Sequence, residues 1–466
     1  MQKQLNQNSA LLILCLASFL VPFMGSAINL SLPQIGKSFA MGAVSQSWVA
    51  TIYLITTAIF QVPFARLADL FGRKRMFVFG LMLFGISTFL CGLSFSGAML
   101  IAMRALSGLG CAMMFGTSMA ILVSIFPPQH RGKAIGINTA VVYFALASGP
   151  FFGGILTHNF GWQSLFYLVG VLGFVVAIFA VAVLKHEWTE AKGEHFDYIG
   201  SAIYALGLFG LIFGFSELPS AFGFILIAAG IFCFTVFVLY ELKDKQPVFN
   251  VRIFHGNKVF GLSSLSALLN YTCTSAIAFM MSLYLQYIRG FTPQNAGLIL
   301  IVQACIQCVV SLYAGRLSDR HNPSMLATSG MAVIVAGLAG LIFITPNTSM
   351  LFITLLLFLL GFGFGLFSSP NSNVIMNSVD KKYYGQASAT MGTMRLTGQA
   401  FSMGIATMAI SLSVGNKVIT PELHSGFMKS FHITFIICAA LCIAGTFASS
   451  FRVKKQPAEE VFLPKL

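Results

Sequence analysis

The sequence predicts an all-α integral membrane protein of about 14 transmembrane helices, built as two six-helix pseudo-symmetric bundles plus a two-helix insert. Three observations predict this class. Of the 466 residues, 57% are hydrophobic and 9% are charged, whereas soluble proteins carry roughly 25% charged residues. The apolar residues form long blocks, such as 11–32, 76–94 and 350–370. Two segments in the first half of the chain also have counterparts in the second half.

The long apolar blocks are expected to be helices. A bilayer core about 30 Å thick needs about 20 apolar residues in a helix, and in lipid each backbone amide must be satisfied within its own segment. The block at 11–32 is too long for a signal peptide and is followed by further blocks, so it is expected to be the first span. We expect spans near 11–32, 47–66, 76–94, 98–126, 133–156, 163–184, 198–216, 220–240, 259–287, 296–315, 325–344, 350–370, 389–412 and 430–450. Pro370 is expected to break the twelfth span near its cytoplasmic end.

The basic residues predict the orientation of these spans. With the N-terminus inside, 21 of the 27 Lys and Arg residues fall on the cytoplasmic side, four fall outside, and two, Arg104 and Arg395, lie within spans. This asymmetry follows the positive-inside rule. The net charge of +14 therefore predicts a multi-pass protein of the cell membrane with both termini cytoplasmic, and no nucleic-acid partner.

Internal repetition predicts the domain organisation. Ala65-Arg-Leu-Ala-Asp69 is echoed by Gly315-Arg-Leu-Ser-Asp319, at an offset of 250 residues. Arg131-Gly-Lys-Ala is echoed by Tyr384-Gly-Gln-Ala, at an offset of 253. In transporters with parallel halves, the substrate site lies between the halves near the bilayer midplane. We expect an N-terminal six-helix bundle at 1–186, a two-helix insert with flanking cytoplasmic loops at 187–251, a C-terminal six-helix bundle at 252–455 and a cytoplasmic tail at 456–466.

The loop after the second span contains Asp69-Leu-Phe-Gly72-Arg73-Lys-Arg75. Gly72 permits a tight turn, and Asp69 can cap a helix or pair near its N-terminus. A solvated, positively charged loop is the simplest interpretation. The echo at Asp319 favours a gating role instead.

Two motifs within spans also point to function. Arg104 lies in the fourth span, where a charge at the centre costs at least about 2.5–3.5 kcal/mol. It is expected to face a wet cavity or a partner, unless it snorkels to the interface. The fifth span contains Gly149-Pro150-Phe-Phe-Gly153-Gly154, in which the proline can kink the helix and the glycines allow another helix to approach closely.

These motifs, together with Phe23-Met24-Gly-Ser-Ala-Ile-Asn29 in the first span and Ser47-Trp-Val-Ala-Thr-Ile-Tyr53 in the second, resemble those of the major facilitator superfamily, and within it the fourteen-helix drug:proton antiporter family. The resemblance covers nearly the whole chain. It implies that the loop with Asp69, Gly72 and Arg73 latches the two halves in the outward-facing state, with Asp319 as its counterpart. It also implies that Arg104 takes part in proton coupling or charge sensing.

For the Gly149–Gly154 motif, the resemblance implies a seal between the halves and favours export over uptake. The sequence departs from the family pattern at Met24, where an aspartate usually stands, at Ala65, where glycine is usual, and at Ser107, where glutamine is usual.

The missing aspartate bears on the cargo. None of the thirteen acidic residues lies deep in a predicted span, whereas Arg104 and Arg395 offer two cations that would attract anions. We therefore expect neutral, amphipathic or anionic small molecules as substrates. Protons are the expected coupling ion, carried by Asp69 with Arg104 or by His158 or His432, since histidine titrates near physiological pH. Sodium coupling and uncoupled transport stay open.

Residues within spans are candidates for the substrate cavity. For the polar ones, hydrogen bonding between helices is the alternative interpretation. The candidates are Met24, Asn29, Tyr53, Tyr143, Asn270, Gln303, Gln307 and Gln399.

The sequence predicts a transporter and not an enzyme. It contains no phosphate-binding loop of the form Gly-x4-Gly-Lys-Ser/Thr, which argues against ATP-driven pumping. No metal and no cofactor are expected, and the nine cysteines lie in apolar blocks, where they serve packing. The expected function is alternating-access, proton-coupled export of amphipathic small molecules or drugs. The alternatives are an exporter or facilitator of one anionic metabolite or lipid, and a non-transporting sensor or scaffold.

Overall fold

The computed structural model describes residues 2–452 apart from 192, 219, 245, 246, 250, 319 and 380–383. These residues form fourteen long α-helices, and no β-strand occurs among them. The helices are α1 (Gln2–Ser38), α2 (Ala43–Phe71), α3 (Arg73–Gly92), α4 (Gly97–Ile125), α5 (Pro128–Phe160), α6 (Trp162–Val183), α7 (Tyr198–Ser216), α8 (Ala221–Glu241), α9 (Lys258–Leu283), α10 (Pro293–Ser318), α11 (Pro323–Ile342), α12 (Met350–Asn377), α13 (Tyr384–Ser413) and α14 (His424–Ser450). Short helices η1 (Val251–Phe254), η2 (Tyr284–Ile288) and η4 (Pro421–Leu423) precede α9, continue α9 and precede α14.

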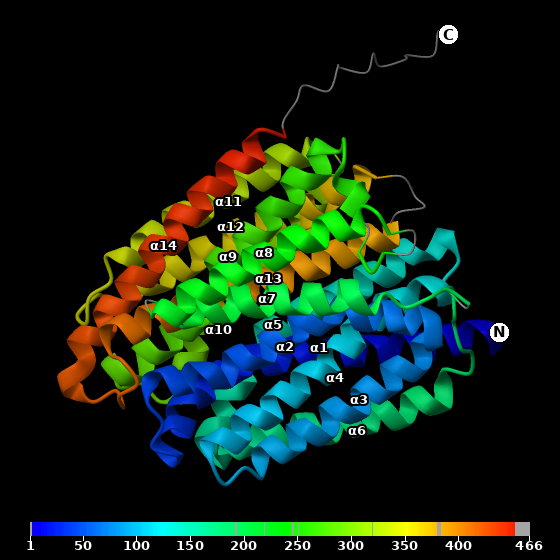
Figure 1. Ribbon diagram of the computed structural model, residues 1–466. Helices are drawn as coiled ribbons and strands as arrows, with labels where there is room; N and C mark the ends of the chain where they lie inside the picture. Colours follow the sequence, from blue (N-terminus) through cyan, green and yellow to red (C-terminus); the bar gives the residue numbers. More distant parts are fainter. Residues whose placement is uncertain are drawn as a thin grey trace, which may run out of the picture.

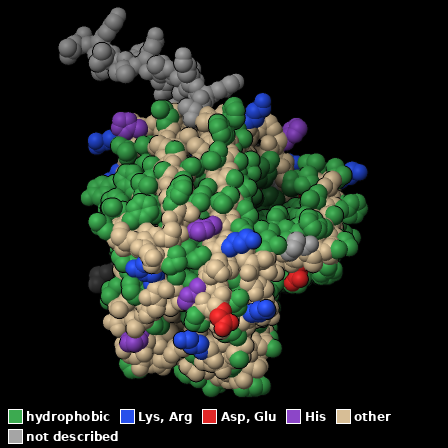
Figure 2. Space-filling model, turned by 90° about the vertical axis from the view of Figure 1, so that its left-hand side faces the viewer, with side chains coloured by type: hydrophobic (Ala, Val, Ile, Leu, Met, Phe, Trp, Pro, Cys, Tyr) green, Lys and Arg blue, Asp and Glu red, His purple; other side chains and the backbone are tan. Residues whose placement is uncertain are grey.

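The helices have the length and composition of membrane spans. In the described part of the chain, thirteen of them are long and apolar enough to cross a bilayer, and α13 is the exception. The shortest helix, α7, has 19 residues, which at 1.5 Å per residue corresponds to about 29 Å, close to the thickness of the hydrocarbon core. Figure 2 shows hydrophobic side chains over the upper part of one face, while charged side chains lie along its upper rim and in its lower part. The predicted all-α membrane class is confirmed.

The helices group into two bundles and an insert (Figure 1). Helices α1–α6 form the N-terminal bundle and α9–α14 the C-terminal bundle, and they meet along a surface that we call the seam. The hairpin of α7 and α8 lies alongside the seam and contacts both bundles. The Tyr204 hydroxyl of α7 donates to the Ala58 carbonyl oxygen of α2 at 3.4 Å. On the other side, the rings of Phe215 (α7) and Phe401 (α13) lie 5.5 Å apart.

Glycines let helices within a bundle approach closely. At Gly110 in α4, an added Cβ would stand 2.5 Å from the backbone nitrogen of Phe84 in α3. Such backbone-to-backbone packing is typical of helices in lipid, where hydrophobic burial does not drive helix association.

Because the chain crosses the bundle fourteen times, α1 begins and α14 ends at the same end. We call this end the terminal face, and the opposite end, where α1 turns into α2, the distal face.

The expected break of the twelfth span at Pro370 is wrong. Helix α12 continues through Pro370 to Asn377. The polar side chains after the proline find partners on neighbouring helices: Asn371 donates to the Ser263 carbonyl oxygen at 3.3 Å and Asn373 to the Ser318 hydroxyl at 2.5 Å. These partners belong to α9 and α10, so the polar stretch after Pro370 packs within the bundle and remains helical.

Candidate functional site in the seam

The two bundles are joined tightly at the distal face. The Ser282 hydroxyl of α9 donates to the Asn29 carbonyl oxygen of α1 at 2.7 Å. The Tyr287 hydroxyl donates to the Gln46 side chain of α2 at 3.1 Å. The Thr407 hydroxyl of α13 lies 2.9 Å from that of Ser47, and both residues are fully buried. These contacts close the distal end of the seam.

The glycine-proline motif of α5 lies in this closed region. An added Cβ at Gly149 or Gly153 would stand 2.7 and 2.6 Å from the Cβ atoms of Ser26 and Ala27 in α1. An added Cβ at Gly154 would stand 2.6 Å from the Pro293 carbonyl oxygen at the start of α10. The motif therefore packs α5 against α1 within its own bundle and against α10 of the other bundle.

Pro150 takes part in the same contact. Its carbonyl oxygen faces Gly297 of α10 so closely that a Cβ there would overlap it. Backbone meets backbone across the seam at this level, which leaves no room for a side chain on either helix.

Nearer the terminal face, few hydrogen bonds between described residues join the bundles. The Tyr143 hydroxyl of α5 bonds to the Ser368 hydroxyl of α12 at 3.0 Å. The Arg395 guanidinium of α13 lies 5.3 Å from the ring centre of Phe115 in α4. No hydrogen bond between two described residues joins the bundles closer to the terminal face than these. Hydrogen bonds between described residues of the two bundles are therefore concentrated toward the distal end, while Gly392 of α13 still packs closely on Gln61 of α2 nearer the terminal face.

Arg395 lies at the middle level of the seam, as the twelfth of the thirty residues of α13. The residue is half-buried. It forms no ion pair with any described carboxylate, because all four described ion pairs join 66–75 to 69 or to 187–194 at the terminal face. Tyr271 of α9 lies within electrostatic reach of Arg395 and Tyr143, and its ring packs edge-on against Phe364 at 5.6 Å.

Arg104 has a different environment. It is 1% exposed, its Nε donates to the Val49 carbonyl oxygen of α2 at 3.0 Å, and its guanidinium lies 4.3 Å from the ring centre of Tyr53. Its Nη1 and Nη2 atoms are buried without a hydrogen-bond partner. The structure thus places Arg104 and Tyr53 inside the N-terminal bundle, and Cys111 of α4 lies within electrostatic reach of both Arg104 and Arg395.

The other cavity candidates are distributed over both bundles. Met24 and Asn270 are fully buried, and neither amide atom of Asn270 has a partner. Asn29 is 8% and Gln307 9% exposed, while Gln303 and Gln399 are half-buried. Of the eight candidates, Gln399 lies one turn from Arg395 on α13, and Tyr143 and Arg395 both lie within electrostatic reach of Tyr271.

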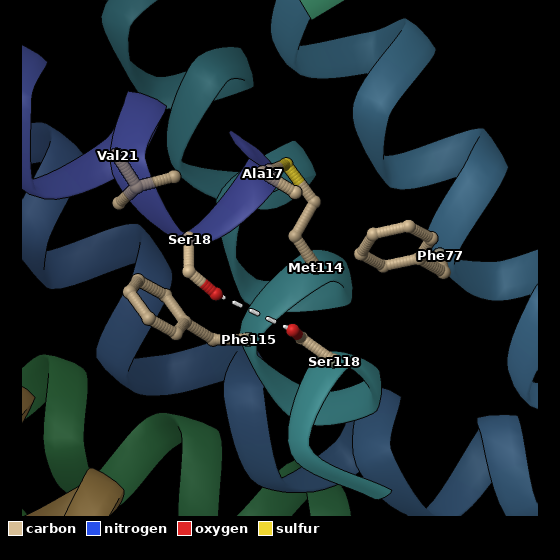
Figure 3. A pocket seen from close by; sticks show the side chains of 7 residues that line it. All are labelled: Ala17, Ser18, Val21, Phe77, Met114, Phe115 and Ser118. Carbon is tan, nitrogen blue, oxygen red and sulfur yellow. Dashed lines mark hydrogen bonds between the residues drawn. The ribbon is translucent and has the colours of Figure 1, made fainter. Parts of the chain in front are cut away.

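A small cavity lies behind Phe115, inside the N-terminal bundle between α1, α3 and α4. Figure 3 shows Ser18 and Ser118 facing each other across it, with 3.5 Å between their hydroxyl oxygens. Its free volume of about 10 Å³ is about enough for one water molecule. This cavity is too small to hold a substrate.

The loop between α2 and α3 is held by the linker between α6 and α7. Arg73 donates to both carboxylate oxygens of Glu190 at 2.7 and 2.8 Å and to Asp69 at 2.7 Å. Arg66 pairs with Glu194 at 2.5 Å. Gly72 has φ of 123°, a conformation that favours glycine. The expected counterpart Asp319 lies outside the described residues.

Sequence reasoning missed the partners of this loop. The available signal was the spacing of the acidic residues Glu187, Glu190 and Glu194 in the polar linker, whose side chains could reach the basic turn. Phe115 was also missed, because one phenylalanine among 47 has no distinguishing pattern.

Comparison with known proteins agrees with this architecture. The profile of the Major Facilitator Superfamily matches residues 14–403. The chain is 26% identical to the riboflavin transporter RibZ of Clostridioides difficile (strain 630), over 96% of this chain and 97% of that protein. It is 28% identical to the multidrug resistance protein Stp of Mycobacterium tuberculosis (strain CDC 1551 / Oshkosh), over 84% and 73%.

Among solved structures, a bacterial homolog of the human lysosomal transporter Spinster, in an inward-facing and occupied conformation, is similar with a TM-score of 0.71. The likeness covers 95% of this chain and 96% of that one, at 16% sequence identity, and it concerns the fold alone. Because the family profile spans most of the chain, the protein belongs to the Major Facilitator Superfamily, a family of membrane transporters and not of enzymes.

Proposed function

We propose that this transporter exports amphipathic small molecules, neutral or anionic, by alternating access in exchange for protons. The observation that carries the proposal is the asymmetry of the seam. The distal end is closed by hydrogen bonds and by backbone packing of Gly154 on α10, whereas no hydrogen bond between described residues joins the bundles on the terminal side of Tyr143 and Ser368. We further propose that the terminal face is cytoplasmic, as the basic residues predict, so that the seam opens inward.

In this proposal, residues 1–186 and 252–455 are the two moving bodies, 187–251 is the insert between them, and 456–466 is a cytoplasmic tail. The substrate would bind at the level of Tyr143 and Arg395, between the bundles. The glycines and proline of α5 would separate from α10 when the distal end opens.

Asp69, Gly72 and Arg73 would belong to the opposite gate. Their present partners come from the α6–α7 linker, so this gate would have to exchange Glu190 for a partner on the C-terminal bundle when the terminal end closes.

The names of the relatives are consistent with small-molecule cargo, since one is a multidrug resistance protein and another a riboflavin transporter. A second candidate function is transport of one specific anionic metabolite or lipid. It is favoured by the position of Arg395, a cation in the seam without a carboxylate partner among the described residues.

The test is transport by the purified protein in liposomes with an imposed pH gradient, using a panel of neutral, anionic and cationic dyes. We expect saturable accumulation that follows the pH gradient and is lost when a protonophore dissipates it. Saturable flux that ignores the gradient would refute proton coupling. The absence of saturable flux for every dye would favour the sensor or scaffold instead.

A further inference from the structure

We propose that Arg395 and the aromatic rings around it bind planar aromatic carboxylates, with the substrate carboxylate on the guanidinium and the substrate ring among Phe115, Tyr143 and Tyr271. This inference rests on the proposed function and narrows it from amphipathic compounds in general to one chemical class.

The first argument is the unsatisfied charge of Arg395. A guanidinium has five N–H donors arranged to match a carboxylate, and none of those of Arg395 bonds to a described residue. Its nitrogen atoms are not enclosed either. The buried polar atoms without partners include Nη1 and Nη2 of Arg104 but no atom of Arg395. The guanidinium nitrogen atoms of Arg395 are therefore accessible at their surface and free of hydrogen bonds to described residues.

The second argument is the chemistry of its surroundings. Phe115 covers one side of the guanidinium, which leaves its N–H edge available. A planar carboxylate can approach this edge with two parallel hydrogen bonds, which are about twice as strong as bonds between neutral groups. In a seam lined by Phe115, Phe364 and Tyr271, such a pair would be shielded from water.

The third argument is the position of two tyrosine rings near this level of the seam. The Tyr143 and Tyr271 side chains are half-buried, and each has one attachment that fixes its position. Tyr143 is held by Ser368, and Tyr271 is held edge-on by Phe364 at 70°. Aromatic pairs prefer offset-stacked or edge-to-face arrangements, so a planar ring between them would gain contacts on two sides.

The same arrangement selects against cations. A cationic ligand at this level would meet Arg395 with no described carboxylate to offset it, and like charges at close range in a low-dielectric site repel strongly. The site therefore distinguishes ligands by the sign of their charge as well as by shape.

The experiment compares three fluorescent aromatic probes: fluorescein, whose phenyl ring carries a carboxylate, the neutral riboflavin, and the cation ethidium. Flux into proteoliposomes and binding to the detergent-purified protein by fluorescence anisotropy are measured for the wild type, Arg395→Gln and Arg395→Lys. Lys429→Gln, which removes an exposed cation of α14, is the matched control. Monodisperse elution of each variant on size-exclusion chromatography verifies folding.

We expect Arg395→Gln to raise the dissociation constant and half-saturation concentration for fluorescein at least tenfold, and those for riboflavin less than threefold. Arg395→Lys should be intermediate, because it keeps the charge and loses the planar fork. Lys429→Gln should change neither. If Arg395→Gln does not fold, Tyr271→Ala takes its place and should weaken fluorescein binding while leaving the preference for anions.

The inference fails if fluorescein does not bind the wild type, or if Arg395→Gln weakens all three probes equally. Fluorescein binding that depends on Arg395 without any flux would support the site and refute the proposed export. Flux of riboflavin without any effect of Arg395 on fluorescein would refute the site and leave the proposed export standing.

Discussion

The contact between α5 and α10 at the distal face gives a quantitative prediction for Gly154→Ala. The new Cβ would stand 2.6 Å from the Pro293 carbonyl oxygen and 3.2 Å from the Gln294 Cα. Both are backbone atoms, so they cannot rotate away as a flexible side chain would. Relief requires α10 to withdraw from α5 by several tenths of an ångström, and overpacking of this kind costs about 1–3 kcal/mol.

This cost applies only while the distal end is closed. Alanine also raises the helix propensity of α5 by about 1 kcal/mol, but α5 is helical in the open and the closed form alike, so that gain does not alter their ratio. A differential cost of 1–3 kcal/mol shifts the equilibrium toward distal opening by roughly fivefold to 150-fold.

The assay is the labelling rate of a cysteine placed in the distal contact by Thr407→Cys. Thr407 is fully buried against Ser47 in the closed form, so a hydrophilic maleimide reaches this position only after opening. The rate should rise by the same factor of roughly five to 150 in Gly154→Ala. Native cysteines are accounted for by the protein without the Thr407 substitution.

Gly136→Ala is the matched control. It lies in the same helix, and an added Cβ there has nothing within 4 Å, so it should leave the labelling rate unchanged. Equal rates in Gly154→Ala and Gly136→Ala would show that the α5–α10 contact does not hold the distal end closed. A rate increase accompanied by global unfolding would also refute the reasoning.

Two further predictions concern the terminal face. Glu190→Gln should lower the free energy of unfolding by only about 1 kcal/mol, because the Glu190 side chain is 64% exposed and Arg73 keeps Asp69 as a second carboxylate partner. Thermal melting in detergent measures this loss of stability. A loss as large as that caused by Arg73→Ala would contradict the prediction. Arg452→Ala should lower the free energy of unfolding by about 1–3 kcal/mol, since it leaves the Oδ1 atom of buried Asn371 without its donor, while the Nδ2 atom keeps its bond to Ser263. Burial lowers the pKa of Arg452 to about 10, so the group stays charged and its effect on the melting temperature should be the same at pH 6 and pH 8.

The helices were predictable because a bilayer permits few backbone conformations. A chain segment in a bilayer must satisfy its own amides, so hydropathy alone identifies nearly every helix here. Their ends were less predictable. The first span was expected at 11–32, and α1 covers Gln2–Ser38, because helical hydrogen bonding continues into the polar zones where hydropathy no longer indicates a span.

The site was predictable in its residue types and not in its partners. Arg104 and Arg395 look equivalent in the sequence, each a cation within a span. The rotation of α4 turns Arg104 toward Val49 inside its own bundle, whereas α13 presents Arg395 to Phe115 across the seam. This difference arises from tertiary packing, which periodicity in one helix does not determine.

Acidic residues near the membrane illustrate the same limit. The eighth span is expected to stop near 240, just before Glu241, yet Glu241 is the last residue of α8 and is fully buried. It lies beside Asp197, which accepts from the Gly200 amide at the start of α7. These carboxylates are buried only when α7 packs against α8, and no local sequence pattern indicates that packing.

Helix α13 does not meet the hydropathy criterion for a membrane span, and it is also the helix that carries Arg395. It alone among the described helices is too polar to count as a membrane span, because its inner stretch carries Thr393, Arg395, Thr397 and Gln399. A helix facing lipid could not carry these groups without cost, but α13 is packed among α2, α7, α9 and α14. Its polar residues are therefore compatible with the membrane only because other helices surround it. A polar helix at the seam also suits a transporter, because a substrate that leaves water there can bind polar protein groups and need not enter the lipid.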